Sequence, residues 1–452
     1  MADEEYSLSE FEEDEESFEE SDGESYESEN DHVDESKDFS ETDKELHNLF
    51  ESTNLEDVGG DEFAIQSPEI LLATLRKEDD TYLEFESLKV NRIKCLGLCK
   101  IIFGHDDWRT AEAHIQLAEA YTKGKWYHQQ SLKHANLARD ILLAVQNKNK
   151  GSVPYLELES LLQNMYLILG KTNLKLGRDK ASENCLLKAK LVSDKTQSGS
   201  IKFQLLRVSI LSALADTSSK LGNFGQSTEF IEEALENVHK MDDTYKHLAI
   251  NLYKQMVNIE LLNEKYANLD AANDSAQKAL SISIDENGHD FQETAELFTL
   301  LCKVESLREI SDYDKIEKNI SEALGIYETL DLNEKQISTL QIHCKILMQQ
   351  DKLVDAKSLL DGAIEKCENW FGDCSLQTAE LYDLMGSILF AQKRLPNALS
   401  YFTKAFEIYD GKRKCLKKKE KLKHIIEIIR KTCKDDKLKT SEERLKERPR
   451  FA

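Results

Sequence analysis

Phe103-Gly-His-Asp-Asp-Trp-Arg-Thr-Ala-Glu112 is a ten-residue frame that returns twice, as Asn287-Gly-His-Asp-Phe-Gln-Glu-Thr-Ala-Glu296 and as Phe371-Gly-Asp-Cys-Ser-Leu-Gln-Thr-Ala-Glu380. The glycines of the last two copies, Gly288 and Gly372, lie 84 residues apart, which is twice 42. A fixed period of this size is typical of stacked helical repeats. Such a solenoid offers an extended surface for binding, so the frame predicts a binding protein before any single residue is considered.

The last repeat unit shows the pattern most clearly. Its second helix carries Ala398, Phe402 and Ala405, spaced four and three residues apart, so the three side chains lie on one helix face. Small residues at the ends of this triplet let two helices pack closely, and Gly386 on the first helix is expected where its partner approaches. A triplet of alanine, bulky residue and alanine is typical of the tetratricopeptide repeat.

Equivalent triplets recur back along the chain, separated by 42, 40, 44, 45, 45 and 51 residues. They predict about seven units, preceded by a partial unit whose second helix spans 84–103, and the unit around Ala272 is the most degenerate. In order, these triplets are Ala356, Leu360 and Ala363; Ile316, Ile320 and Ala323; Ala272, Ala276 and Ala279; Ser227, Ile231 and Ala234; Ser182, Leu186 and Ala189; and Ser131, Ala135 and Ala138. Leu117, Tyr121, Gly170 and Gly386 complete the expected packing positions on the first helices.

The period near 42 exceeds the usual 34 residues of this repeat. The extra residues lengthen the second helix, which we expect to end at the Phe-Gly or Asn-Gly step, because glycine accepts a left-handed conformation just past a helix. Kinesin light chains and their relatives use this longer form. The fold class expected is therefore all-α, a right-handed superhelical solenoid of tetratricopeptide repeats.

Charge divides the 452 residues into three parts. Residues 1–62 hold 27 acidic and 2 basic residues, a net charge of −25, whereas residues 411–452 hold 17 basic and 7 acidic residues, a net charge of +10. The expected organisation is a disordered acidic tail at 1–66, the repeat solenoid at 67–410, a basic capping helix at 411–434 and a basic tail at 435–452.

Both tails leave alternatives open. Tyr6, Phe11 and Phe18 punctuate the acidic tail, which either solubilises the protein or offers short linear motifs to basic or apolar grooves. The basic end has an apolar helix face that either caps the last repeat or docks a partner; it comprises Leu416, Leu422, Ile425, Ile426 and Ile429. The neighbouring lysines form a solvated run that could also touch anionic lipid or the acidic tail of another copy, but without aromatic platforms they do not indicate nucleic-acid binding.

No catalytic or cofactor signature stands out, so we expect no enzyme activity, no cofactor and no bound metal. Cys95 and Cys99 lie one helical turn apart with His105 nearby, but two thiols and one imidazole do not complete a tetrahedral site. The nine cysteines are odd in number and contain no C-x-x-C pair, which favours a reducing, cytoplasmic compartment. No apolar stretch approaches the ~18 residues of a membrane span.

One segment goes beyond a generic repeat. Ile101-Ile-Phe-Gly-His-Asp-Asp-Trp-Arg-Thr-Ala-Glu-Ala-His-Ile-Gln-Leu-Ala-Glu-Ala-Tyr121 is followed by Lys133-His-Ala-Asn-Leu-Ala-Arg-Asp-Ile-Leu142, and Ser67-Pro-Glu-Ile-Leu-Leu-Ala73 lies upstream. Together they resemble the tetratricopeptide repeat protein 23 and 23-like family, strongly over the first unit and at the level of the repeat up to Asp410. The resemblance implies a non-enzymatic adaptor at the primary cilium or its base that supports Hedgehog signalling by joining a membrane-proximal protein complex.

The partner is expected to be a peptide or helix held on the concave face of the solenoid, which the first helices line. Candidate contacts are first-helix positions that the packing does not use: Asn164, Lys171, Asp216, Thr299, Lys303, Gln341, Lys345 and Asp383. The alternative is a cargo adaptor of the kinesin-light-chain type in the cytosol. Such chains carry heptads ahead of their repeats, and residues 1–62 show no heptad pattern.

Overall fold

The computed structural model describes residues 67–77, 84–124, 126–148, 154–196, 199–263, 267–308, 312–412 and 415–446, with side chains described up to residue 432. The acidic tail predicted over 1–66 therefore lies outside the described residues. The chain divides at Gly104 into two compact units. In the first, α2 (Pro68–Leu75) packs on α3 (Phe85–Phe103), where the side-chain amide of Asn91 donates to the carbonyl of Leu75.

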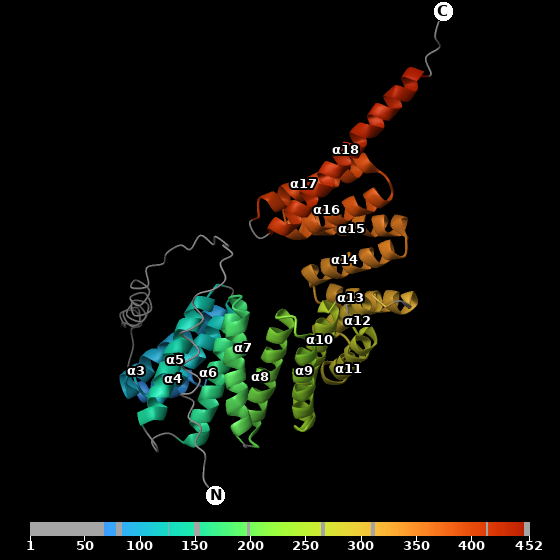
Figure 1. Cartoon of the computed structure of the whole chain (residues 1–452). Coiled ribbons are helices and arrows are strands. Elements are labelled where there is room, and N and C mark those ends of the chain that lie inside the picture. Colours follow the sequence, from blue (N-terminus) through green and yellow to red (C-terminus); the bar gives the residue numbers. More distant parts are fainter. Residues whose placement is uncertain are drawn as a thin grey trace, which may run out of the picture. The chain divides into compact units, whose positions relative to one another are not determined.

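Within the described residues of the second unit, all regular structure is helical and falls into seven antiparallel pairs followed by α18 (Figure 1). The pairs are α4 (Trp108–Lys123) with α5 (His128–Lys148), α6 (Tyr155–Lys175) with α7 (Asp179–Lys195), α8 (Ile201–Lys220) with α9 (Phe224–His239), α10 (His247–Leu262) with α11 (Leu269–Asn287), α12 (Gln292–Glu305) with α13 (Tyr313–Thr329), α14 (Asn333–Gln349) with α15 (Leu353–Phe371), and α16 (Leu376–Ala391) with α17 (Leu395–Asp410). A short 3₁₀ helix, η2 (Asp243–Tyr245), precedes α10. Each pair is one repeat unit, and the all-α repeat fold predicted from the sequence is confirmed.

The triplets lie where the helices of each pair meet. All seven fall on the second helices, and none of their residues is more than 2% exposed. This includes the unit around Ala272, whose three alanines are fully buried despite its degenerate sequence. The expected first-helix positions Leu117, Tyr121, Gly170 and Gly386 are buried as well.

Two glycines set the closest approach between helices. A Cβ atom added to Gly170 would lie 2.4 Å from Cγ of Leu186, and one added to Gly386 would lie 2.6 Å from the ring of Phe402. In both units the bulky middle residue of the triplet therefore occupies the space that a side chain on the first helix would need. The second helix packs directly on the backbone of the first.

The ten-residue frame joins consecutive units. Gly288 and Gly372 end their helices with φ of 91° and 82° and ψ of 171° and 162°, so φ is positive as expected, while ψ is extended rather than left-handed helical. This conformation is essentially restricted to glycine. It places each carbonyl within reach of the next helix: the Thr294 hydroxyl donates to the Gly288 oxygen at 2.9 Å, and that of Thr378 donates to the Gly372 oxygen at 2.8 Å.

Buried hydroxyl groups link the first three repeat units. Ser131 and Ser182, the first residues of their triplets, donate to the carbonyls of Ala118 and Gly170 on their own first helices at 2.9 and 2.8 Å. The same hydroxyls contact threonines on the next first helix, Ser131 to Thr172 at 2.9 Å and Ser182 to Thr217 at 3.1 Å. Each serine thereby fixes the position of two successive first helices with one buried atom.

We expect Thr378→Val to lower the stability of the last unit by about 1 kcal/mol, because the Gly372 carbonyl loses its donor while side-chain volume is kept. Thr432→Val removes a hydroxyl that bonds only within exposed α18 and serves as the control. Amide hydrogen exchange over 372–391 measures the effect. Equal protection in both variants would show that the frame threonine does not hold the junction.

The basic capping helix differs from its predicted bounds. It begins at Leu416 and continues to Lys446, so residues 435–446, expected in the tail, are helical. No glycine or proline interrupts 412–446, so nothing in the sequence stops the helix once it has begun. Leu422, Ile426 and Ile429 are buried in a cluster shared with α14 to α17, whereas Leu416 is 61% exposed and takes no part in that buried face.

Candidate functional site

The first helices of the second unit share one side of the repeats, which we call the first-helix face. It consists of the unburied side chains of α4, α6, α8, α10, α12, α14 and α16, and α18 extends it as the next helix in sequence. Among the predicted contact residues, Lys171, Asp216, Lys303 and Lys345 are exposed, and Asn164, Thr299, Gln341 and Asp383 are partly exposed. The structure thus leaves all eight accessible to some degree.

Lys171 and Asp216 lie together on this face. Desolvation lowers the pKa of Lys171, an effect that the nearby carboxylates of Glu119 and Asp216 oppose. Desolvation likewise raises the pKa of Asp216, against a hydrogen bond from Gln255 and the charges of Lys220 and Lys171. Both side chains are exposed, and each charge lies close enough to the other to influence its pKa.

Gln255 is a part of this cluster that the sequence did not indicate. Its amide nitrogen donates to Asp216 Oδ1 at 3.0 Å, and its amide oxygen accepts from the Ser212 hydroxyl at 2.8 Å. The cluster therefore spans α6, α8 and α10. Gln255 lies 39 residues after Asp216 along the chain, which is close to one repeat. The repeat spacing could therefore have identified Gln255 from the sequence.

The glutamates of the ten-residue frame connect the later first helices. Glu296 on α12 pairs with Lys254 on α10 and with Lys335 on α14, both at 3.1 Å. Burial acts to raise the pKa of Glu296, but hydrogen bonds from Gln292, Lys335 and Lys254 outweigh it and lower that pKa. These contacts hold successive repeats in register on the first-helix face.

Glu380, the frame glutamate of the last unit, repeats the arrangement. It accepts from Gln341 on α14 at 3.3 Å and pairs with Lys418 on α18 at 2.6 Å. Gln341, predicted as a partner contact, therefore already has a partner within the chain. Asp383 lies beside this pair, and its pKa is raised by desolvation, against the charges of Lys421, Lys418 and Lys345.

The other predicted contacts are more separate. Thr299 donates to the carbonyl of Ala295 and contacts the Thr339 hydroxyl at 3.3 Å, so it joins α12 to α14. Lys303 lies four residues further along α12, and Asn164 lies seven residues before Lys171 on α6, which places each on the same helix stripe as its neighbour.

An apolar groove at the C-terminal end of the face was not predicted. Ser387 and Phe390 of α16, Phe402 of α17, and Ile425 and Ile428 of α18 line a cavity of about 190 Å³. Ser387 and Phe390 follow Asp383 at four and seven residues, so the stripe that identified Asp383 could have indicated them. Ile425 had been placed within the apolar face of the cap, where the structure leaves it half-buried.

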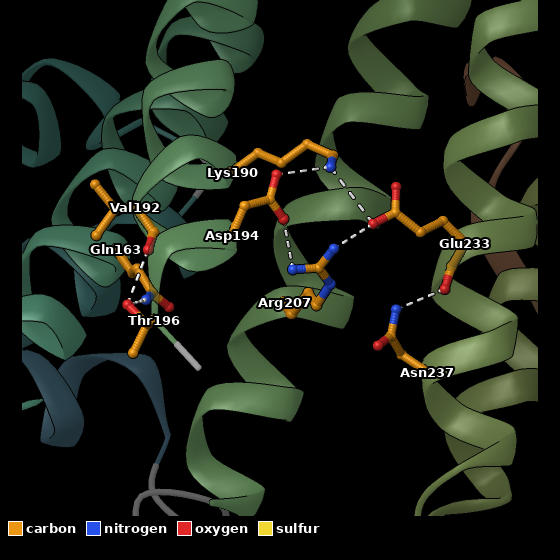
Figure 2. Close-up of polar contacts among 8 residues, drawn as sticks. All are labelled: Gln163, Lys190, Val192, Asp194, Thr196, Arg207, Glu233 and Asn237. Carbon is orange, nitrogen blue, oxygen red and sulfur yellow. Dashed lines mark hydrogen bonds and ion pairs between the residues drawn. The ribbon is translucent and has the colours of Figure 1, made fainter. Parts of the chain in front are cut away.

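A second charged cluster lies between α7, α8 and α9 and has a structural role (Figure 2). Arg207 contacts Asp194 at 2.6 Å and Glu233 at 2.5 Å, and Lys190 contacts the same two carboxylates at 3.0 and 3.4 Å. Every charge in this cluster has an opposite neighbour on another helix or turn. It joins two consecutive repeat units.

Of the residues weighed for metal chemistry, the two cysteines are core residues and His105 is exposed. Cys95 and Cys99 are 1% and 0% exposed on α3, and the thiol of Cys95 donates to the side-chain oxygen of Asn91. Among the described side chains, no three histidine, cysteine, aspartate or glutamate residues come together as a metal site. None of the described helices is long and apolar enough to cross a membrane.

Comparison with known proteins agrees with this architecture. The family model for the tetratricopeptide repeat matches residues 336–410, which form the last two units. Mouse tetratricopeptide repeat protein 23-like is 25% identical over 367 residues, covering 79% of this chain and 79% of that protein. Human tetratricopeptide repeat protein 23 is 23% identical over 352 residues, and the match covers 72% of this chain and 73% of the human protein.

The fold is similar to that of a solved structure, the apo form of RapI. The TM-score is 0.50 with 10% sequence identity, and the match covers 81% of this chain and 96% of the other. Repeats of this kind are typical of protein-binding scaffolds. The chain therefore carries tetratricopeptide repeats and is similar over most of its length to the proteins named tetratricopeptide repeat protein 23 and 23-like, as its first unit predicted.

Proposed function

We propose that this chain is a non-enzymatic scaffold that holds a peptide or helix of a partner protein on its first-helix face. The observation that carries the proposal is the cluster of Lys171, Asp216 and Gln255 on three successive first helices, where exposed charges of both signs lie together. Accessible charges of both signs on one face are suited to bind complementary charges of a partner.

The place of action is the primary cilium or its base, in the cytoplasm, where the scaffold supports Hedgehog signalling. The resemblance to the tetratricopeptide repeat protein 23 family supports this part of the proposal. The partner is a protein of a membrane-proximal complex. Proximity labelling in ciliated cells is the experiment that identifies it.

Charge reversal tests the binding face. In a variant with Lys171→Glu, Lys303→Glu and Lys345→Glu, we expect recruitment of the tagged protein to the ciliary base to be lost, since reversing each contacting charge costs ~1–3 kcal/mol of binding. The control reverses Lys180, Lys318 and Lys366, which are exposed on second helices and give the same change in net charge. Fluorescence localisation measures recruitment, and circular dichroism checks the fold.

Lys171 needs a milder variant as well, because its reversal places a third carboxylate near Glu119 and Asp216. Changing the same three lysines to Gln removes the charges without that repulsion and should weaken recruitment in a folded protein. If the Gln variant and the Glu variant both fold and concentrate at the ciliary base like the wild type, the first-helix lysines are not the binding site. If the wild type itself is absent from cilia, the proposed location is wrong.

A further inference from the structure

The apolar groove defined by Ser387, Phe390, Phe402, Ile425 and Ile428 is open to solvent. Phe390 is 46% exposed and Ile428 is 45% exposed, while Phe402 forms the floor at 2% exposure. The two exposed side chains come from different helices, α16 and α18, and both line the groove. Large apolar side chains that remain exposed along one groove mark a surface that gains free energy when covered.

The size of the groove indicates what can cover it. A cavity of about 190 Å³ is smaller than the roughly 300–1,000 Å³ that encloses a drug-sized ligand. It accommodates one or two apolar side chains. A helix or peptide that lays such side chains into a groove between helices is a common mode of peptide recognition, with anchors at spacings of three or four residues.

The residues around the groove indicate the charge of its occupant. On α18, Lys421 lies one turn before Ile425 and Lys431 lies one turn after Ile428, and both are exposed. Between Leu416 and Thr432 this helix carries seven lysine and arginine residues against two glutamates. Lys418 and Lys419 pair with Glu380 and Asp410, and Asp383 offsets part of the charge of Lys421, which still leaves an excess of positive charge on α18. An acidic segment is the complement of this rim.

Beyond Ile428, α18 leads away from the groove. α18 continues without a break to Lys446, 18 residues past Ile428, which places that end about 27 Å further along the helix axis. Figure 1 shows α18 continuing past the helices on which it packs.

We infer that this groove binds an acidic segment of a partner protein that inserts two apolar side chains, one helical turn apart, between Phe390 and Ile428. The inference rests on the proposed function and specifies the partner chemistry at one end of the binding face. Phe390, Ile425 and Ile428 hold the apolar anchors, and the lysines of α18 attract the acidic residues around them.

A peptide selection tests the assignment. The purified full chain is used to select from a library of random 16-residue peptides displayed on phage, with peptides tiled across residues 1–62 of this chain as a second set. We expect enrichment of acidic peptides with two large apolar residues three or four positions apart. A selected peptide, measured by fluorescence anisotropy, should bind a Phe390→Glu and Ile428→Glu double variant at least about tenfold more weakly.

The matched control is a Leu262→Glu and Val354→Glu double variant, which removes two exposed apolar residues elsewhere and should bind the peptide like the wild type. Lys431→Glu should weaken binding severalfold, and added salt should do the same. Because both groove positions are nearly half exposed, the fold should persist; Phe390→Ala with Ile428→Ala provides a milder pair if it does not.

Three results would overturn the assignment. Selected peptides without acidic residues would refute the charge argument, and equal affinity for the groove variant and the control would place binding elsewhere. If peptides from residues 1–62 bind the groove more tightly than any selected peptide, the occupant is this chain's own acidic segment and not a partner. The selection uses no cells, so its failure is distinct from a failure of recruitment to the ciliary base.

Discussion

Ala405→Glu is expected to unfold the last repeat unit locally, at a cost on the order of 3–5 kcal/mol. Ala405 is fully buried in the cluster that joins α16, α17 and α18, and the apolar side chains around it include Phe402, Met385 and Leu422. A carboxylate placed there would be desolvated and would lack a partner. In a solenoid each unit contacts only its neighbours, so the loss should stay near the C-terminal end.

Amide hydrogen exchange is the appropriate measurement, because a single melting temperature averages over units that can unfold separately. Protection should fall sharply in α16 to α18 and remain unchanged in α6 to α8. Ser400→Glu, on an exposed position of the same helix, is the control and should change protection little. Unchanged protection in the Ala405→Glu variant would mean that the repeat register described above is wrong.

The effect should also depend on pH in a defined direction. Burial raises the pKa of the introduced carboxyl in the folded state above its value in the unfolded chain. The destabilisation is therefore fully present above that raised pKa and decreases as the pH falls through it, because the protonated acid is easier to bury. Exchange protection in α16 to α18 of the variant should recover partly toward pH 5.

Gly386→Ala is expected to destabilise the same unit although alanine favours helices. The added Cβ would lie 2.6 Å from two ring carbons of Phe402, so the ring or the helix must shift. Overpacking of this kind typically costs about 1–3 kcal/mol, which exceeds the roughly 0.5–1 kcal/mol gained by replacing glycine in a helix. The net change should be a loss of stability, measured by urea denaturation followed by circular dichroism.

Gly362→Ala is the matched control for this substitution. Gly362 lies inside α15, where an added Cβ would meet nothing within 4 Å. The same chemical change should there stabilise the protein by about 0.5–1 kcal/mol. The two variants should thus shift the denaturation midpoint in opposite directions, and a shift in the same direction would refute the close approach of Phe402 to the α16 backbone.

The binding face was only partly predictable. The rule that selected Lys171, Asp216 and Asp383, unused positions on first helices, located accessible residues but could not show which of them contact one another. Gln341 satisfies the rule and yet bonds with Glu380. Side-chain contacts between units depend on the rotation of each helix about its axis, and a sequence period does not specify that rotation.

The C-terminal end of α18 depends on local helix propensity and not on contacts between units. The capping helix was predicted to end at 434, yet the helix continues to Lys446. Nothing between 412 and 446 breaks it, and lysine, glutamate and leucine all favour helix. Beyond the last residue that packs on another helix, the intrinsic helix propensity of the residues decides where the helix ends.

By itself the sequence determined the class of fold and the register of the repeats. The spacing of four and three within each triplet requires a helix face, and a small residue at one or both ends favours a close neighbour, so the pattern indicates how the helices pack. Only the tertiary structure decided how surface residues combine: the cluster of Lys171, Asp216 and Gln255, the frame glutamates that pair between units, and the groove lined by Phe390 and Ile428. The core repeats because every unit meets the same packing constraint, whereas each part of the surface depends on which two helices bring their side chains together.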